Sequence, residues 1–137
     1  MDHVLHPLLV EGIIQHTDDE APRLLLRDNR GRALEIHVGI CEAKAVQMGL
    51  ENETTLRPMT HDLLLVLVGQ FEAQVTSVVI DDVSSGTFFA RLTLTTPTEV
   101  LHLDCRPSDG IALALRARAP ILATEAVIES GGSLHYS

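Results

Sequence analysis

Apolar and polar positions follow two different periods along this chain. Across residues 34–38 they alternate, which is the pattern of a strand with one buried face and one polar face. Residues 111–115 are apolar without interruption, and they follow Pro107, Ser108 and Asp109, which suit the first turn of a helix. This helix therefore has no polar face over that stretch, and we expect it to be buried on nearly every side.

The same patterns predict one α+β domain over residues 1–129, followed by a flexible tail at 130–137. The sequence Asp-Asn-Arg-Gly at 28–31 predicts a hairpin turn, and Thr96-Pro97 predicts a second one. Strands are expected at residues 8–14, 23–27, 32–38, 74–80, 87–95, 98–105 and 120–128, and helices at 42–50, at 62–71 with Thr60 as the cap, and from 108 onward.

Two β-hairpin-plus-helix units resemble each other at an offset of 67 residues. The offset takes Leu34 to Leu101 on the strands and Glu42 to Asp109 in the first turns of the helices. We therefore predict an internal duplication, with two similar units around a mixed β-sheet. Chance similarity between two α/β patterns is the alternative.

The composition limits the kinds of partner. The chain has 137 residues, 45% of them apolar, and a formal net charge of −9, so it can bury a core and remain globular. This acidity is opposite to the basic charge that holds many proteins on nucleic acid. Cys41 and Cys105 are isolated thiols, which favours neither a zinc site nor a disulfide. The N-terminus has no export signal, so we expect a soluble cytoplasmic protein without membrane contact.

A first polar cluster lies on the second predicted hairpin. If this hairpin turns at Thr96-Pro97, Arg91 faces His102 across the strands and lies diagonal to Asp104, all on the polar face. Such a trio could bind a phosphate or hold His102 as a general base. An exposed ion pair between strands is the alternative.

A second cluster lies where the last strand of this hairpin meets the buried helix. Asp104, Arg106 and Asp109 are expected to crowd this corner. An arginine beside the free backbone N–H groups of a helix start can bind an anion. An internal pair between Arg106 and Asp109 is the alternative.

Two further pairs could supply metal ligands. His61 and Asp62 follow the predicted cap Thr60, where a helix cap with an acid at the positive end of the dipole is the simpler interpretation. Asp81 and Asp82 are neighbours at the end of a strand, so they are expected to point to opposite faces. An aspartate at the entry to a turn is the commoner role for such residues.

Several segments, in order along the chain, resemble the bifunctional nuclease family. The sequence has no Walker loop, nucleophile elbow, H-E-x-x-H or C-x-x-C motif. The resemblance lies in G-I-C-E-A-K-A at 39–45, R-P-M-T-H-D-L at 57–63, V-V-I-D-D-V-S-S-G-T-F-F-A-R-L at 78–92, D-C-R-P-S-D-G-I-A-L-A-L-R at 104–116 and A-P-I at 119–121. The resemblance implies a compact α+β fold and a nuclease that acts on both DNA and RNA.

Phosphodiester hydrolysis needs an activated water and stabilisation of charge at the phosphate, and the polar clusters can be given these roles. We predict that Mg²⁺ or Mn²⁺ assists, that no organic cofactor is needed, and that the chain forms a homo-oligomer through apolar surface. The predicted catalytic residues are Asp104, Asp109, His61 and His102, the phosphate-binding residues are Arg91 and Arg106, and the metal ligands are Asp81, Asp82, Asp62 and Glu42.

Two other functions stay open. One is a non-catalytic regulatory or protein-interaction module that self-associates. The other is the binding of a small anion or nucleotide at the helix start beside Arg106 and Asp109.

Overall fold

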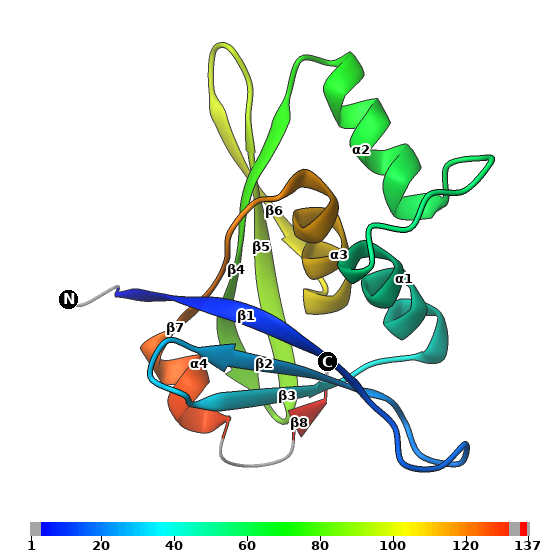
Figure 1. Ribbon diagram of the computed structural model, residues 1–137. Coiled ribbons are helices and arrows are strands. Elements are labelled where there is room, and N and C mark those ends of the chain that lie inside the picture. Colours follow the sequence, from blue (N-terminus) through cyan, green and yellow to red (C-terminus); the bar gives the residue numbers. More distant parts are fainter. Residues whose placement is uncertain (1–3, 132–134, 137) are drawn as a thin grey trace.

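A computed structural model describes residues 4–131 and 135–136, and it confirms the α+β class (Figure 1). The elements in chain order are β1 (Leu5–Ile14), β2 (Arg23–Asp28), β3 (Ala33–His37), α1 (Ile40–Leu50), α2 (Thr60–Gln70), β4 (Gln74–Ser84), β5 (Thr87–Thr95), β6 (Val100–Cys105), α3 (Pro107–Ala117), β7 (Ile121–Thr124), α4 (Glu125–Ser130) and β8 (His135–Tyr136).

The described strands form one mixed sheet in the order β4-β7-β1-β2-β3-β8-β5-β6. Because β4 also pairs with β5, the order closes into a ring, and β6 is left outside that ring on the far edge of β5. Most pairings are antiparallel, whereas β7 runs parallel to β4 and β8 runs parallel to β3 and β5. Among the described strands, β6 is therefore the one that has no strand neighbour on one of its sides.

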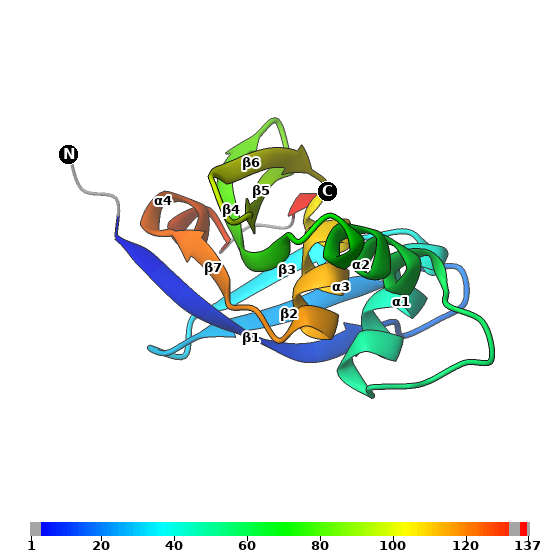
Figure 2. The same cartoon turned by 90° about the horizontal axis from the view of Figure 1, so that it is seen from above.

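Helix α3 lies at the centre of the molecule, as its apolar sequence predicted. Helices α1, α2 and α3 gather on one side of the strands, and α4 lies at the other end beside β7 (Figures 1 and 2). Gly110 of α3 makes close packing possible, since a Cβ there would lie 2.5 Å from Val78 Cγ2 and 3.0 Å from Cys105 Sγ. Glycine thus lets the helix backbone rest directly against β4.

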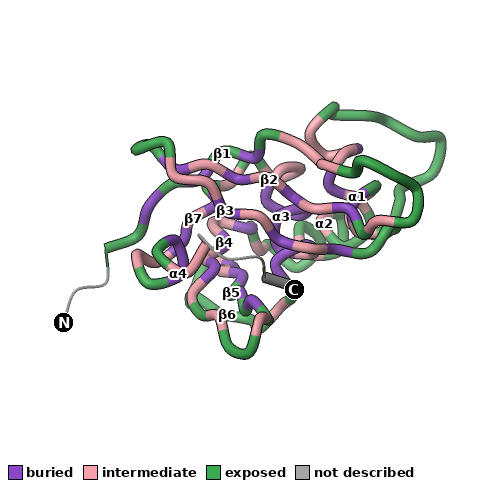
Figure 3. Tube along the Cα trace, turned by 90° about the horizontal axis from the view of Figure 1, so that it is seen from below, coloured by how far each residue is buried: buried purple, intermediate pink, exposed green. Residues whose placement is uncertain are grey.

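Helix α2 is apolar over most of its length, but none of its residues is buried. Figure 3 shows purple, buried stretches along α3 and the strands, while α2 has only exposed and intermediate positions. Its exposed apolar side chains are Leu63, Leu64, Val66 and Leu67. A helix of this kind normally packs against another apolar surface.

Several predicted boundaries are wrong, three of them through a different turn, element or cap. The hairpin of β5 and β6 turns through residues 96–99, with the Thr96 N–H bonded to the Glu99 carbonyl at 2.9 Å, and not at Thr96-Pro97 alone. The strand predicted at 120–128 ends at Thr124, whose side chain accepts the Val127 N–H at 3.3 Å and so caps α4. The cap of α2 is Met59, and Thr60 is the first helical residue.

The internal duplication is not confirmed. The offset of 67 does align α1 with α3 and β3 with β6. However, Leu34 and Ile36 are buried in the interior of the sheet, whereas their counterparts Leu101 and Leu103 are exposed. The two units share an order of elements without sharing an environment.

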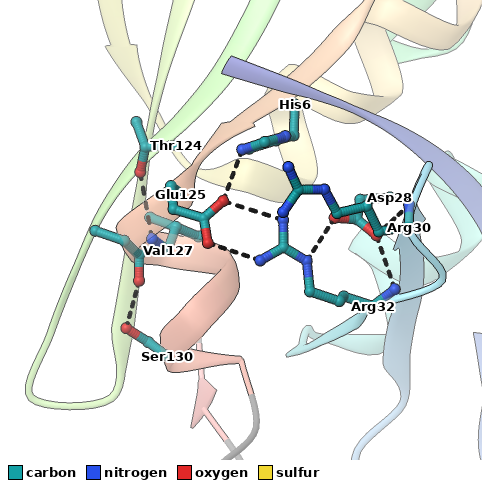
Figure 4. Close-up of polar contacts among 9 residues, drawn as sticks. His6, Asp28, Arg30, Arg32, Thr124, Glu125, Val127 and Ser130 are labelled. Carbon is teal, nitrogen blue, oxygen red and sulfur yellow. Dashed lines mark hydrogen bonds and ion pairs between the residues drawn. The ribbon is translucent and has the colours of Figure 1, made fainter. Parts of the chain in front are cut away.

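A polar network fixes the end of the molecule opposite α2 (Figure 4). Glu125 of α4 accepts two bonds from Arg32, at 2.7 and 3.0 Å, and one from His6 of β1 at 2.7 Å. Arg32 Nε also donates to Asp28 at 2.8 Å, and Asp28 accepts the backbone N–H groups of Arg30 and Arg32. The hydrogen bonds from Arg32 lower the pKa of Glu125 to about 2. The network therefore ties α4 and β1 to the turn between β2 and β3.

Half of the tail predicted at 130–137, residues 132–134 and 137, lies outside the described residues. Within it, Ser130 ends α4, and His135–Tyr136 pair with β3 and β5 as β8. The domain boundary at residue 129 stays a prediction.

Candidate functional site

A cavity of about 530 Å³ opens on the outer face of β4, β5 and β6, where side chains point away from the core. It unites five of the residues predicted from sequence, which came from two separate clusters. Its lining consists of Asp81, Asp82, Phe89, Ala90, Arg91, His102 and Asp104. This size suits a small ligand or a segment of a larger one.

A bulge in β4 brings both aspartates to this cavity. Ile80 pairs with Ala90 and Asp82 pairs with Phe89, so Asp81 is an additional residue between them. Such an additional residue shifts the alternation of side chains by one position. The prediction that Asp81 and Asp82 face opposite sides is therefore wrong, because it assumed a regular strand.

The register of β5 and β6 differs from the predicted one by two residues. Arg91 lies opposite Asp104, and His102 lies opposite Thr93, whose Oγ1 is 3.2 Å from His102 Nδ1. The predicted facing pair of Arg91 and His102 is wrong because the turn contains four residues and not two. Since the shift is even, all three predicted side chains keep their expected face.

Asp104 keeps its full capacity to accept hydrogen bonds. Arg91, its neighbour across the strands, points Nε toward Asp81 Oδ2 at 3.5 Å. Asp82 Oδ1 accepts the backbone N–H of Val83 at 2.8 Å. Within the part of the chain that the structure describes, Asp104 makes no side-chain hydrogen bond or ion pair. A free carboxylate in a cavity is available to water, metal or substrate.

The charge of this cavity favours a cation. Asp81, Asp82 and Asp104 contribute three negative charges against the one positive charge of Arg91. Among residues 4–131 and 135–136, no group of three or more His, Cys, Asp or Glu side chains converges closely enough to hold a metal alone. Mg²⁺ is commonly held by one or two carboxylates, with water and substrate phosphate completing its shell, and the cavity fits that mode.

The remaining predicted residues form a second group, where α1, α2 and α3 meet. Arg106 donates Nη1 to Glu42 and Nε to Asp109, both at 2.9 Å. His61 Nε2 lies 2.9 Å from the other oxygen of Asp109. Arg106 and Asp109 thus form the internal pair considered as the alternative, and Asp104 is separated from them on the strand face.

A second arginine of this group ties α2 to α3. Arg116 donates Nε to Asp62 Oδ1 at 2.7 Å and Nη1 to the carbonyl of Ala112 at 2.8 Å. Asp62 Oδ2 accepts the backbone N–H of Met59 at 3.0 Å, so it also serves the helix start. Asp62 and Arg116 border a cavity of about 610 Å³, but they pair with each other there and its other walls are mostly apolar or uncharged.

These contacts keep the carboxylates of the second group ionised. Burial of Asp109 opposes its ionisation, but the hydrogen bonds from Arg106 and His61 outweigh burial and lower its pKa. For Glu42, its own backbone N–H and then Arg106 lower the pKa. Glu42 and Asp109 are therefore engaged with protein partners, in contrast to Asp104.

The thiol of Cys105, between the two groups, has a raised pKa. Burial, followed by the nearby charges of Asp109 and Asp104, raises the pKa of this thiol to about 11. It is therefore protonated at neutral pH, and the thiolate is the reactive form.

Sequence analysis missed two residues of the cavity region, Phe89 and Thr93. Phe89 lines the cavity and is 41% exposed, and Thr93 contacts the ring of His102. Both lie two positions from Arg91 on β5, so the alternation of a strand would have placed them on the same face. That spacing was the available signal.

The fold and the cavity define an α+β domain with an acidic, arginine-containing site on an open sheet face. A family model described as the bifunctional nuclease domain matches residues 24–134, so this chain belongs to the bifunctional nuclease domain family. Two uncharacterized proteins of Mycobacterium tuberculosis, from strains CDC 1551 and H37Rv, are each 37% identical to it over 126 residues. The match covers 91% of this chain and 75% of each relative.

Among the described residues, no helix has the length and apolar character needed to cross a membrane.

Proposed function

We propose that this protein hydrolyses phosphodiester bonds of DNA and RNA in the cavity on β4, β5 and β6, with the help of a divalent metal ion. The observation that supports this best is the gathering of Asp81, Asp82, Arg91, His102 and Asp104 around one cavity. Family membership supports the reaction class. The location and the residue roles rest on the geometry.

Arg91 is proposed to bind the scissile phosphate. Its side chain is 57% exposed, and its ion pair with Asp81 uses Nε, which leaves the two Nη groups for phosphate oxygens. A guanidinium can make two parallel bonds to a phosphate, so it orients the group as well as neutralising it.

His102 and Asp104 are proposed to activate the water. In the tautomer whose Nδ1–H donates to Thr93 Oγ1, His102 Nε2 is free to accept a proton. The oxygen of the water attacks phosphorus while Nε2 takes its proton, and the bond from phosphorus to the leaving oxygen breaks. The leaving oxygen then takes a proton from solvent. Asp104 orients the water and stabilises the imidazolium.

Asp81 and Asp82 are proposed to hold Mg²⁺ or Mn²⁺ together with the phosphate. The ion supplies positive charge at the phosphate and lowers the pKa of a bound water. Without it, the three carboxylates and Arg91 leave a net negative cavity that repels a polyanion. No organic cofactor enters this proposal.

Phe89 is proposed to contact a base. It lies two residues before Arg91 on the same face of β5, at a distance of about 7 Å along the strand. Aromatic stacking does not select one base or one sugar, which suits a site that accepts both DNA and RNA.

Glu42, His61, Asp62, Arg106 and Asp109 are proposed to position the site and not to touch the substrate. Their ion pairs hold α1 and α2 against α3. Because β6 leads into α3 through Arg106, this group fixes the end of the strand that carries Asp104.

The test is digestion of labelled single-stranded DNA and RNA by the purified protein with Mg²⁺, with Mn²⁺ and with EDTA. Asp104→Asn, expressed and purified in parallel, controls for contaminating nuclease. Metal-dependent cleavage by the native protein and its loss in Asp104→Asn are expected. Equal cleavage by both preparations would contradict the proposed site.

We also propose that the chain self-associates, because apolar side chains remain exposed on α2 and on β6. This observation equally favours the second candidate, a non-catalytic interaction module. The same digestion assay separates the two, since such a module gives no metal-dependent cleavage.

A further inference from the structure

Strand β6 has one paired edge and one open edge. It pairs with β5 over six residues, from Val100 to Cys105, without a bulge. On its other side it has no strand neighbour among the residues that the structure describes. Every second residue of such an edge presents its backbone N–H and C=O groups outward, where another strand can pair with them.

The sequence of this edge does nothing to discourage pairing. Natural edge strands are commonly protected by lysine, proline, a bulge or a covering segment. The segment V-L-H-L-D-C has none of the first three, and its first five residues are exposed.

The two faces of β6 differ in character. Leu101 and Leu103 are 37% and 46% exposed, and they lie opposite the core residues Leu94 and Leu92 of β5, on the side that the helices cover. His102 and Asp104 lie on the other face, in the cavity. An added strand would lie beside β6 in the sheet, so it would extend both the apolar face and the polar face.

We propose that a second copy of this chain occupies this edge, with the two β6 strands antiparallel about a two-fold axis at Leu103. A two-fold axis perpendicular to the sheet keeps each side chain on the same face, so two residues that pair must lie on the same face. Their numbers then differ by an even number, and the axis passes through a residue and not between two residues. Centring on Leu103 places His102 of each copy opposite the partner's Asp104. Centring on His102 or Asp104 instead places two histidines or two aspartates opposite each other.

The facing of His102 and Asp104 favours this register over the other two. An imidazole N–H of His102 can donate a hydrogen bond to the partner's Asp104 across the two strands, whereas two facing aspartates repel each other. The pairing also brings Leu103 of both copies together at the axis, which removes apolar surface from water.

This pairing joins the two cavities into one open face, with His102 of one copy beside the partner's Asp104. Each site then gains a residue from the other copy. The inference rests on the proposed self-association, and it does not depend on whether the protein cleaves nucleic acid.

Disulfide trapping tests the register directly. In a background of Cys41→Ser and Cys105→Ala, Leu103→Cys places two thiols opposite each other, with Cα atoms about 4.5–5.5 Å apart. This distance lies within the range of a disulfide. Val100→Cys is the matched control on the same exposed strand, since its two thiols would lie about 20 Å apart.

Mild oxidation should convert most of the Leu103→Cys protein to a covalent dimer on a non-reducing gel, and leave Val100→Cys monomeric. Equal trapping of both, or trapping of Val100→Cys alone, would overturn the register. Circular dichroism and melting temperature establish that each variant is folded.

Sedimentation of variants of the whole chain tests which surface forms the interface between the two copies. Leu103→Lys places two like charges at the axis and should convert the dimer to a monomer, whereas Leu67→Lys on the exposed face of α2 should not. If the Leu67→Lys protein is a monomer and the Leu103→Lys protein is still a dimer, the interface lies on α2 and the inference is overturned. A monomeric native protein would overturn both this inference and the proposed self-association.

Discussion

Arg91 and Asp104 lie directly opposite each other on β5 and β6, but the guanidinium of Arg91 turns toward Asp81 on β4. The ordinary cross-strand ion pair is thus not formed, and the Asp104 carboxylate has no protein partner among the described residues. Exposed acids next to an arginine usually pair with it. That Asp104 does not do so makes it the most informative residue to change.

Asp104→Asn should lower the rate of metal-dependent cleavage at least about a hundredfold, which corresponds to about 2.7 kcal/mol of barrier. The melting temperature should not change, since the side chain is exposed and makes no stabilising bond. Both quantities are measured on the same preparation, with Asp19→Asn in the exposed 16–20 turn as the control. A folded Asp104→Asn protein with native activity would remove this residue from the mechanism.

Arg91→Lys should raise KM for an oligonucleotide about tenfold or more, because lysine cannot make the two parallel bonds to a phosphate. Steady-state kinetics at several substrate concentrations measure this effect. Arg91 is mostly exposed, so the melting temperature should stay within about a degree of the native value. An unchanged KM would show that the phosphate binds elsewhere.

Arg106→Gln should give the reverse result. It breaks the bonds to Glu42 and Asp109, so α1 loses a contact with α3, and the melting temperature should fall by a few degrees. Cleavage per folded molecule should be retained, as thermal melts and kinetics on one sample can establish. Loss of turnover at an unchanged melting temperature would return Arg106 to the substrate-binding role expected from sequence.

The stability of the protein should fall in acid through Glu125. A carboxyl whose folded-state pKa is about 2, against an ordinary value of 4.5, stabilises the fold only while it is ionised. That contribution is complete above pH 4.5 and is lost as the pH falls toward 2. Urea unfolding midpoints from pH 7 to pH 2 should fall less steeply for Glu125→Gln than for the native protein and for Glu53→Gln, an exposed control. Parallel curves for all three would contradict the proposed contribution of the network.

Nucleic acid should bind weakly without divalent metal and more tightly with it, because the chain carries a net charge of −9 and its cavity is acidic. Fluorescence anisotropy with a labelled oligonucleotide measures the affinity in Mg²⁺ and in KCl of equal ionic strength, with Asp104→Asn used to avoid turnover. Tight binding without metal, with a steep dependence on salt, would reveal a basic surface that outweighs the acidic cavity.

The sequence predicted the class of fold, the central helix and most element positions, because these depend on local periodicity. It failed at the hairpin of β5 and β6, where the number of turn residues depends on how Thr96 bonds to Glu99. It also missed α4, although Thr124 followed by Glu125 is a recognisable helix start. A short apolar run fits a strand and a helix equally well, and tertiary contacts decide between them.

The ten predicted site residues were chosen for the chemistry of their side chains, since the sequence does not give their positions in space. The structure separates them into two groups. Asp81 reached the cavity only through a bulge, which depends on the pairing of two strands and leaves no local signature. Arg106 lies two positions after Asp104 in the sequence, but the corner between β6 and α3 turns its side chain toward Glu42. The contacts between segments far apart in the chain decide such placements, and a single sequence does not contain them.

The position of β1 in the sheet has a consequence for synthesis of the protein on the ribosome. One edge of β1 pairs with β2, which emerges shortly after it, and the other pairs with β7, near the end of the chain. His6 likewise meets its carboxylate partner only when Glu125 has emerged. Strand β1 is therefore completed only after β7 has emerged, and a nascent chain stalled before residue 121 carries an open strand edge to which chaperones or other nascent chains can bind.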